Sequence, residues 1–224
     1  MADIRKKRPI LPGISEEELE SGSFCEELFS ENFVLDDPAG EGIAIIGDNA
    51  DGTCGRGAEF RDCFFKKCSF QGIRWKNAAF QNCVFVDCDL SNAHLSEAFL
   101  RRCRFVGCKM VGCDLSYAIL RDVTFEKTVM RFLNLSFGKW NGVCFTECDL
   151  SEASVMALQE NRGLILEEST LRRTEFTETS LKDVDLTTNE IGGLLVSGAR
   201  ELKGAIVTEI QAIQLASLLG VIVR

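Results

Sequence analysis

Every fifth residue between positions 60 and 155 is large and apolar. The series runs Phe60, Phe65, Phe70, Trp75, Phe80, Phe85, Leu90, Leu95, Leu100, Phe105, Met110, Leu115, Leu120, Phe125, Met130, Leu135, Trp140, Phe145, Leu150 and Val155. The position two residues before each is usually small, and the other three are mainly polar. A period of five fits neither a helix (about 3.6) nor a long strand (about 2.0). It predicts a backbone that turns a corner every five residues, with one large and one small side chain inward.

The cysteines recur at intervals of twenty residues. One set is Cys63, Cys83 and Cys103, and the other is Cys68, Cys88 and Cys108. Such an interval assigns them to recurring small positions of a repeat, where we expect free thiols that act as small apolar side chains. A zinc site favours close C-x-x-C pairs, whereas the common spacing here is C-x-x-x-x-C. We therefore predict no metal and no cofactor.

Several five-residue units resemble those of the pentapeptide-repeat family, whose consensus is Ala-Asp/Asn-Leu-x-x. The closest matches are Cys88-Asp89-Leu90-Ser91-Asn92, Cys113-Asp114-Leu115-Ser116-Tyr117 and Cys148-Asp149-Leu150-Ser151-Glu152. The resemblance covers residues 58–155 without interruption and resumes afterwards. It implies an all-β solenoid: a right-handed, quadrilateral parallel β-helix with four repeats per coil. Twenty residues per coil agrees with the cysteine interval, because residues i and i+20 would then stack.

Stacking at this interval predicts four internal ladders, one for each side of the solenoid. We name the sides after their first ladder residues: the Phe60, Phe65, Phe70 and Trp75 sides. The Phe65 ladder consists only of phenylalanine: Phe65, Phe85, Phe105, Phe125 and Phe145. Burying each such side chain contributes about 1.5–3 kcal/mol, so contacts between neighbouring coils are expected to hold the fold together.

The repeat pattern divides the chain into three parts. We expect the β-helix to span residues 58–207, with residues 1–57 as an acidic segment of degenerate repeats around Phe24 and Phe29. Residues 42–57 contain five glycines and are expected to be irregular or projecting. The register slips by one after Val155, which predicts a bulge or short loop over residues 156–163 before the pattern resumes at Leu166.

The last part, residues 208–224, is predicted to close the open end of the solenoid. Thr208-Glu209-Ile210-Gln211 has the pattern of a capping box that begins a helix. Its apolar residues and cap are Thr208, Ile210, Ile213, Leu215, Leu218 and Leu219, and a short strand is expected over 221–223. This tail resembles the ending of the Qnr quinolone-resistance subfamily, which implies a homodimer joined through this helix. Capping of a monomer explains the same apolar residues.

Few residues suggest chemistry. His94 is the only histidine and falls in an outward position, and no G-x-S-x-G, H-E-x-x-H or Walker A sequence occurs. We therefore expect a protein that is not an enzyme. No apolar run is long enough to span a membrane, and no apolar stretch follows the charged residues 5–8 as in a secretory signal. We expect a cytoplasmic protein.

The Qnr resemblance implies a DNA mimic that binds DNA gyrase or topoisomerase IV and confers quinolone resistance. The charge distribution tests this idea. Residues 1–55 have a net charge of −9, residues 56–155 of +3 and residues 156–224 of −3. Only the ends are acidic, so the candidate contact residues are Glu175, Glu178, Asp183 and Asp185. Residues 58–155 contain no insertion that would form a projecting loop.

The alternative is a scaffold that binds an unknown protein partner through its flat sides. Phe132 and Phe137 are outward apolar residues that suit such a role. Phe64, Val84, Val86 and Val106 form another outward apolar row. Either a partner or a fold-back of residues 1–41 would cover this row. The basic residues Arg101, Arg102, Arg104 and Lys109 lack interleaved aromatic residues, so we expect no direct binding of nucleic acid.

Overall fold

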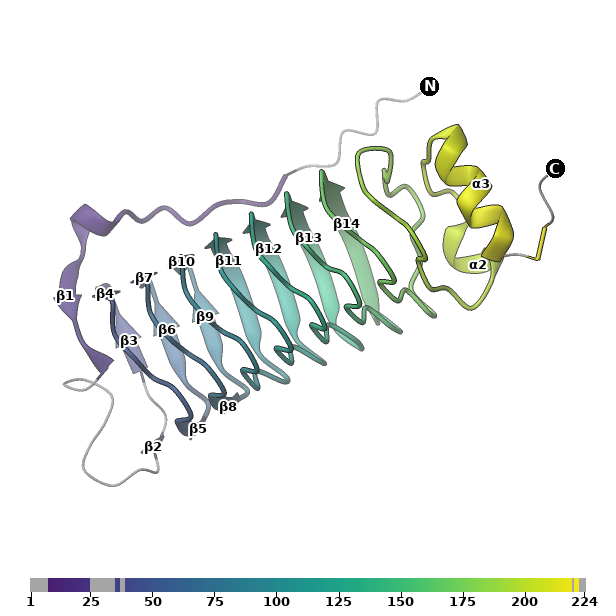
Figure 1. Ribbon diagram of the computed structural model, residues 1–224. Coiled ribbons are helices and arrows are strands. Elements are labelled where there is room, and N and C mark those ends of the chain that lie inside the picture. Colours follow the sequence, from purple (N-terminus) through teal and green to yellow (C-terminus); the bar gives the residue numbers. More distant parts are fainter. Residues whose placement is uncertain (1–7, 25–34, 37–38, 219, 222–224) are drawn as a thin grey trace.

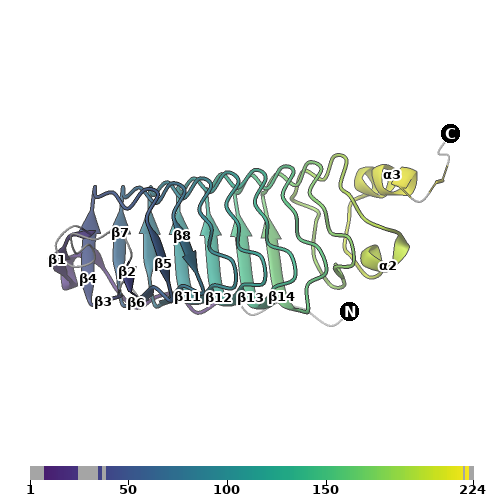
Figure 2. The same ribbon diagram turned by 90° about the horizontal axis from the view of Figure 1, so that it is seen from below.

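The chain folds into a parallel β-solenoid, as the repeat pattern predicted (Figures 1 and 2). The computed structural model describes residues 8–24, 35–36, 39–218 and 220–221. Phe85 lies opposite Phe65 on one side and opposite Phe105 on the other, so these coils contain twenty residues each. The coils stack along one axis, with the helices at the C-terminal end (Figure 2).

The strands are short in the first coils and longer afterwards. The short strands are β1 (Glu20–Gly22), β2 (Leu35–Asp36), β3 (Ala39–Glu41), β4 (Ile43–Ile46), β5 (Cys54–Arg56), β6 (Glu59–Arg61), β7 (Phe64–Lys66), β8 (Arg74–Lys76), β9 (Ala79–Gln81) and β10 (Val84–Val86). The eight-residue strands are β11 (Phe99–Val106), β12 (Ile119–Glu126), β13 (Lys139–Thr146) and β14 (Glu160–Glu167). Each long strand continues from the Phe60 side onto the Phe65 side. On the Phe70 and Trp75 sides, apart from β2, β5 and β8, neighbouring coils are paired through isolated single-residue bridges such as Ser69↔Asp89.

The phenylalanines of the Phe65 side form a continuous stack inside the solenoid. Successive ring centroids, from Phe65 to Phe145, are 4.7, 4.5, 5.0 and 4.9 Å apart. All five side chains are at most 2% exposed. The spacing follows the separation of about 4.8 Å between neighbouring strands. At the N-terminal end the stack is closed by Phe24, which is fully buried and stacks on Phe65.

The corners explain the composition of the repeat. The last residue of most repeats has a positive φ, for example 55° at Asn92 and 60° at Tyr117. In the Asp-Leu-Ser units, the Asp89 carboxylate accepts a hydrogen bond from the Ser91 N–H at 2.9 Å. Asp114 and Asp149 do the same for the residues two positions later, so the aspartate side chain stabilises the turn.

Cysteine suits the small inward position because its thiol can donate to the coil below. Cys103 Sγ lies 3.3 Å from the carbonyl oxygen of Phe80, and Cys148 Sγ lies 3.3 Å from that of Phe125. The ten described cysteines are free, and all but Cys54 are buried. Burial raises the pKa of the Cys148 thiol to about 12, so this thiol remains protonated at neutral pH.

Residues 42–57 are not a projecting stretch, and that prediction is wrong. Strand β4 pairs with β7 and strand β5 with β8, both in the twenty-residue register. The glycines that suggested irregularity occupy corners: Gly42, Gly47, Gly52 and Gly57 all have φ between 66° and 71°. Glycine adopts this conformation without strain. Regular coils therefore begin before residue 58.

The slip after Val155 is a single inserted residue. Phe145 lies opposite Leu166 and Lys139 opposite Glu160, so this coil contains twenty-one residues. Residues 160–163 belong to β14, and the predicted loop is confined to the residues before Glu160. Asn161 takes the place below Trp140 in the Phe60 ladder, where its side chain is half-buried.

The N-terminal residues run back along the solenoid. Residues 8–22, here called the N-terminal strap, follow the edge between the Phe60 and Phe65 sides (Figure 1). Ile10 N–H donates to Asp122 at 3.1 Å and Gly13 N–H donates to Asn82 at 3.0 Å. The strap includes a short 3₁₀ helix, η1 (Glu16–Glu18), and β1, which pairs with β4.

The outward row of the Phe65 side is therefore partly covered by the chain itself. Val84 is 7% exposed, and Thr124 and Cys144, further along the row, are 6% and 3% exposed. Arg8 and Pro9 of the strap line one pocket together with Thr124 and Cys144. The sequence left two possibilities for covering this row, a partner protein or the N-terminal residues. The structure shows the N-terminal strap beside it.

The C-terminal end is closed by two helices, α2 (Ala199–Leu202) and α3 (Glu209–Leu218). Thr208 and Gln211 form the predicted capping box: Gln211 N–H donates to Thr208 Oγ1, and Thr208 N–H donates to Gln211 Oε1. The Gln211 side-chain amide also donates to the carbonyls of Leu186 and Asn189. These bonds attach α3 to the last coil.

Candidate protein-binding surfaces

Exposed apolar residues gather at the C-terminal end of the solenoid. Twelve large apolar side chains are exposed in the described part of the chain, and half of them follow residue 194. These six are Leu195, Ile206, Ile210, Ile213, Leu218 and Val221. Apolar groups concentrated in this way on one end of a molecule are typical of a contact surface. We call this group the apolar end.

Helix α3 divides its apolar residues between the core and the apolar end. Leu215 is only 8% exposed and packs into the core. Ile210 and Ile213, in contrast, are 72% and 54% exposed. Of the six predicted cap or dimer residues, Leu215 therefore serves the monomer, whereas Ile210, Ile213 and Leu218 are available for a contact. Leu219 lies outside the described residues, as do 222 and 223 of the predicted strand.

The four candidate carboxylates lie on the coils next to the apolar end, but on different sides. Glu175 precedes Phe176 on the Trp75 side and Glu178 is at the following corner, whereas Asp183 and Asp185 lie further around the coil. None of the four forms an ion pair within the described part of the chain. They leave negative charge unpaired around the last coils, not on a single side.

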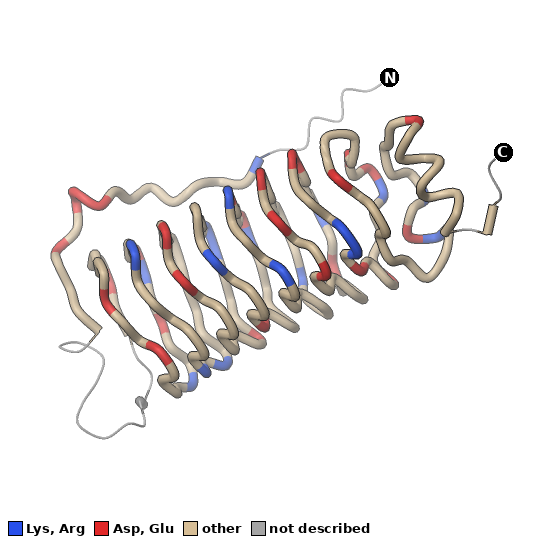
Figure 3. The backbone as a smooth tube through the Cα atoms, viewed as in Figure 1, with Lys and Arg blue, Asp and Glu red and all other residues tan. Residues whose placement is uncertain are grey.

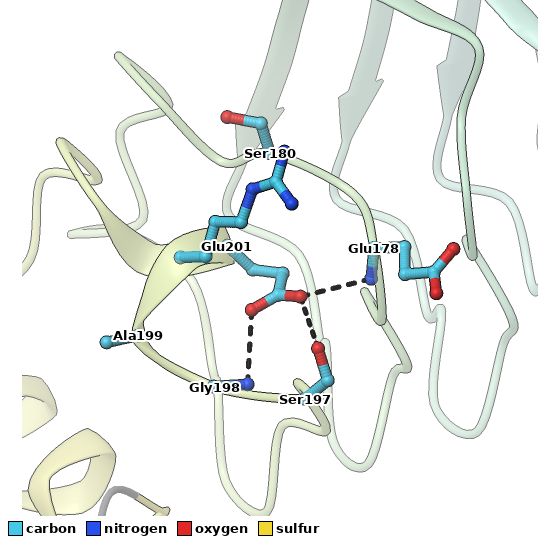
Figure 4. A pocket seen from close by; sticks show the side chains of 7 residues that line it. Glu178, Ser180, Ser197, Gly198, Ala199 and Glu201 are labelled. Carbon is cyan, nitrogen blue, oxygen red and sulfur yellow. Dashed lines mark hydrogen bonds between the residues drawn. The ribbon is translucent and has the colours of Figure 1, made fainter.

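A polar pocket of about 730 Å³ separates these coils from α2 (Figure 4). Its central group is the Glu201 carboxylate, which accepts hydrogen bonds from the Ser197 hydroxyl and from the N–H groups of Gly198 and Glu178. The bond from Ser197, with the backbone donors, lowers the pKa of Glu201. All of these donors come from the chain itself. The carboxylate therefore attaches α2 to the coil that contains Glu178.

An aromatic pair lies on a corner of the Trp75 side, with Tyr117 exposed and Phe137 half-buried. The rings of Tyr117 and Phe137 stack with their centroids 5.0 Å apart, and Tyr117 is 51% exposed. Phe132, on the other corner of that side, is 56% exposed. Phe132 and Phe137 were candidates from the sequence, whereas Tyr117 was missed. The interval of twenty between Tyr117 and Phe137 is the signal that identifies the pair.

The basic residues of the sequence are not one patch. Arg104 pairs with Glu126 at 2.8 Å and Lys109 with Asp89 at 3.2 Å, on the Phe65 and Phe70 sides. Arg101 and Arg102 remain together on the Phe60 side, and Arg121 lies directly opposite Arg101. The sequence grouping therefore included two cations, Arg104 and Lys109, that carboxylates of adjacent coils neutralise.

The described residues show little that suggests catalysis. No cluster of three or more histidine, cysteine or acidic side chains suited to a metal occurs among them. His94 is exposed and lies in the ladder between Arg74 and Asp114. In the same part of the chain, no helix has the length and hydropathy that crossing a bilayer requires.

Comparison with known proteins identifies the repeat. Residues 78–155 match the sequence model of a family described as a pentapeptide repeat region. No curated protein sequence matches the chain significantly.

Solved structures with similar architecture exist at low identity. A trypsin-treated form of QnrB1, a plasmid-mediated fluoroquinolone resistance protein, is 24% identical, with 85% of this chain and 98% of that chain covered and a TM-score of 0.41. Full-length QnrB1 is 21% identical, with coverages of 82% and 100% and a TM-score of 0.32. HetL, a pentapeptide repeat protein involved in heterocyst differentiation regulation in the cyanobacterium Nostoc, is 16% identical, with coverages of 80% and 92% and a TM-score of 0.30.

Proposed function

We propose that this pentapeptide-repeat protein is a non-catalytic, cytoplasmic binding protein that pairs through its apolar end and acts on a type II topoisomerase. The observation that carries the proposal is the concentration of exposed Ile206, Ile210 and Ile213 at one end of the solenoid. A second copy is the occupant that fits this end, because a two-fold contact would bury the same apolar residues of both chains.

The unpaired carboxylates support the choice of target. Pairing through the apolar end would bring two sets of Glu175, Glu178, Asp183 and Asp185 to the middle of an elongated dimer. A concentrated negative field of this kind attracts a surface that normally binds DNA. DNA gyrase and topoisomerase IV present such surfaces, and the tail of this chain resembles Qnr proteins. Protection from quinolones is the corresponding biological role.

Supercoiling by DNA gyrase, with and without a quinolone, tests the proposal. We expect the wild-type protein to restore or inhibit supercoiling in a dose-dependent way. The double variant Ile210→Glu/Ile213→Glu is expected to lose this effect and to be a monomer by light scattering. Gln214→Glu is the matched control, because Gln214 is an exposed polar residue of the same helix. No effect of the wild-type protein on gyrase or on topoisomerase IV would overturn the choice of target.

The four carboxylates are tested separately from the dimer. The variant Glu175→Lys/Glu178→Lys should stay dimeric but lose its effect on gyrase. If it retains the full effect, the acidic coils are not the contact surface.

A scaffold for an unknown protein partner is the second candidate. The stack of exposed Tyr117 on half-buried Phe137 favours it, because the solvated part of the two rings is apolar area that a partner could bury. Under this reading, Phe132→Glu/Phe137→Glu removes a specific partner from a pull-down while any effect on gyrase is unchanged. Loss of the gyrase effect in that variant would favour the first candidate.

A further inference from the structure

One outward column of the Phe60 side is rich in hydrogen-bond donors. From coil to coil its residues are Arg61, Gln81, Arg101, Arg121, Asn141 and Arg162. The two end arginines pair with carboxylates of their own strands, Arg61 with Glu59 and Arg162 with Glu160. The two central arginines lie directly opposite each other in neighbouring strands.

The central arginines differ from the ion pairs of the other sides. Elsewhere, cations often face a carboxylate of the adjacent coil: Lys76–Glu97, Arg104–Glu126, Lys109–Asp89, Lys127–Glu147, Arg131–Asp149 and Arg172–Glu190. Arg101 and Arg121 face a like charge instead, and exposed Arg102 and Lys139 lie beside them. None of these four has an ion pair within the described residues. Like charges directly opposite in a sheet destabilise it, so the fold itself does not account for this arrangement.

An apolar row accompanies the cations. Phe99 lies opposite Ala79 and Ile119 in the ladder next to the arginine column, and all three side chains are half-buried. The Arg121 guanidinium lies over the Phe99 ring, 5.9 Å from its centroid. This contact holds the guanidinium against the sheet. We call Arg101, Arg102, Arg121 and Lys139, with Phe99 and Ile119, the arginine surface.

Carboxylates are confined to the margin of the arginine surface. The nearest one in sequence, Asp122, occupies the corner and accepts the Ile10 N–H of the strap. Glu59 and Glu160 lie towards the ends of the neighbouring column, where they pair with Arg61 and Arg162, and Glu160 also lies opposite Lys139 at the edge of the surface. The centre of the surface therefore presents guanidinium groups whose charge no described acidic side chain neutralises.

We propose that the arginine surface docks an acidic segment of a protein partner. Carboxylates of that segment accept paired hydrogen bonds from Arg101 and Arg121, a geometry that guanidinium groups favour. Apolar side chains of the segment pack on Phe99 and Ile119. A nucleic acid fits less well, because its phosphate backbone carries no apolar side chains that could pack on Phe99 and Ile119. The surface also offers a single aromatic ring, which is already covered by Arg121, for stacking bases.

Fluorescence anisotropy with a labelled peptide of repeating Asp-Leu-Glu tests the proposal. The wild-type protein should bind this peptide at low ionic strength and release it as salt is added. Arg101→Gln/Arg121→Gln keeps the side-chain length but removes both charges, and should weaken binding about tenfold. The control Arg74→Gln/Arg173→Gln removes two exposed arginines that also lack ion pairs among the described residues, and should bind as the wild type does.

Two outcomes overturn the proposal. One is an equal loss of affinity in the test and control variants, which would mean that the peptide responds to the net charge of the protein and not to the arginine surface. The other is tighter binding of a labelled single-stranded or duplex oligonucleotide than of the peptide, which would make this a nucleic-acid surface. A peptide of repeating Ser-Leu-Gln, which lacks carboxylates, should not bind. Far-ultraviolet circular dichroism of both double variants establishes that a loss of binding does not reflect unfolding.

Discussion

The rings of Phe85 and Phe105 stack 4.5 Å apart with their planes 5° from parallel, in the middle of the core. Tyr117 and Phe137 repeat almost the same geometry on the outside, with centroids 5.0 Å apart and planes at 18°. Both pairs are produced by the same twenty-residue interval. They differ in burial, and therefore provide a matched test of what holds the solenoid together.

Phe105→Ala should lower the free energy of unfolding by about 3–5 kcal/mol, because it leaves a cavity between two stacked rings. Phe137→Ala removes the same atoms from a half-exposed corner and should cost less than about 1 kcal/mol. Urea unfolding followed by circular dichroism compares the two variants. Similar losses for both would contradict the assignment of stability to the internal ladder.

The hydrogen bonds to Glu201 should make the C-terminal cap sensitive to acid. Because the folded state lowers the pKa of Glu201 below its usual 4.5, the carboxylate contributes stability above that pH. The contribution is lost as the pH falls through the folded-state pKa. Glu201→Gln should therefore be less stable than the wild type by about 1–2 kcal/mol at neutral pH, and the difference should shrink on acidification.

Melting temperatures measured from neutral to acidic pH test this expectation. Glu152→Gln alters an exposed corner carboxylate with no ion pair among the described residues, and should match the wild type throughout. The difference in melting temperature between Glu201→Gln and the wild type could instead be the same at every pH. That result would mean that the hydrogen bonds to residue 201 do not depend on its negative charge.

Removing the strap should expose Cys144. Burial raises the pKa of this thiol, and Arg8 Nη1 lies 3.8 Å from its sulfur. Deletion of residues 1–19 should increase the rate of Cys144 modification at neutral pH by about tenfold or more, because the reagent gains access to the thiol. Mass spectrometry of the labelled peptides identifies the site. Cys103 serves as the internal control, since its modification would indicate unfolding.

The two opposed arginines of the arginine surface should lower the free energy of unfolding of the protein. Arg101→Gln/Arg121→Gln relieves repulsion between opposed like charges and should raise stability by about 0.2–1 kcal/mol, more at low salt. Arg131→Gln, which breaks the ion pair with Asp149, should leave stability unchanged or lower it. A fall in the melting temperature of the double variant would show that the two arginines support the fold.

The repeat made most of the architecture predictable. Period, coil length and ladder membership follow from inward positions that tolerate only large or small apolar residues. The errors arose where the backbone determines the structure. The corner glycines of 42–57 look irregular by composition, yet their positive φ values are those of any corner. The one-residue slip after Val155 was predicted correctly, but the loop was expected to reach residue 163, whereas β14 already pairs with β13 from Glu160.

The surfaces were less predictable than the core. The strap is held partly by the backbone N–H groups of Ile10 and Gly13. Almost every residue has such a group, so no sequence pattern predicts these contacts. The sequence grouped Arg104 with Arg101 because they are neighbours in the chain, but their outward positions belong to different sides. Which cations are neutralised depends on carboxylates one coil away that are often not in strict register, such as Glu126 for Arg104, so the twenty-residue interval alone does not identify them.

The order of synthesis gives the strap a further significance. Residues 8–22 leave the ribosome before any of the coils on which they will lie, because their contacts with Asn82, Asp122 and Glu167 are 69, 112 and 159 residues away in the chain. Each docking point is created only when the coil that bears it has formed. We therefore expect the strap to be laid down progressively as the solenoid grows, so that the bond between Arg8 and Glu167 marks a nearly finished chain.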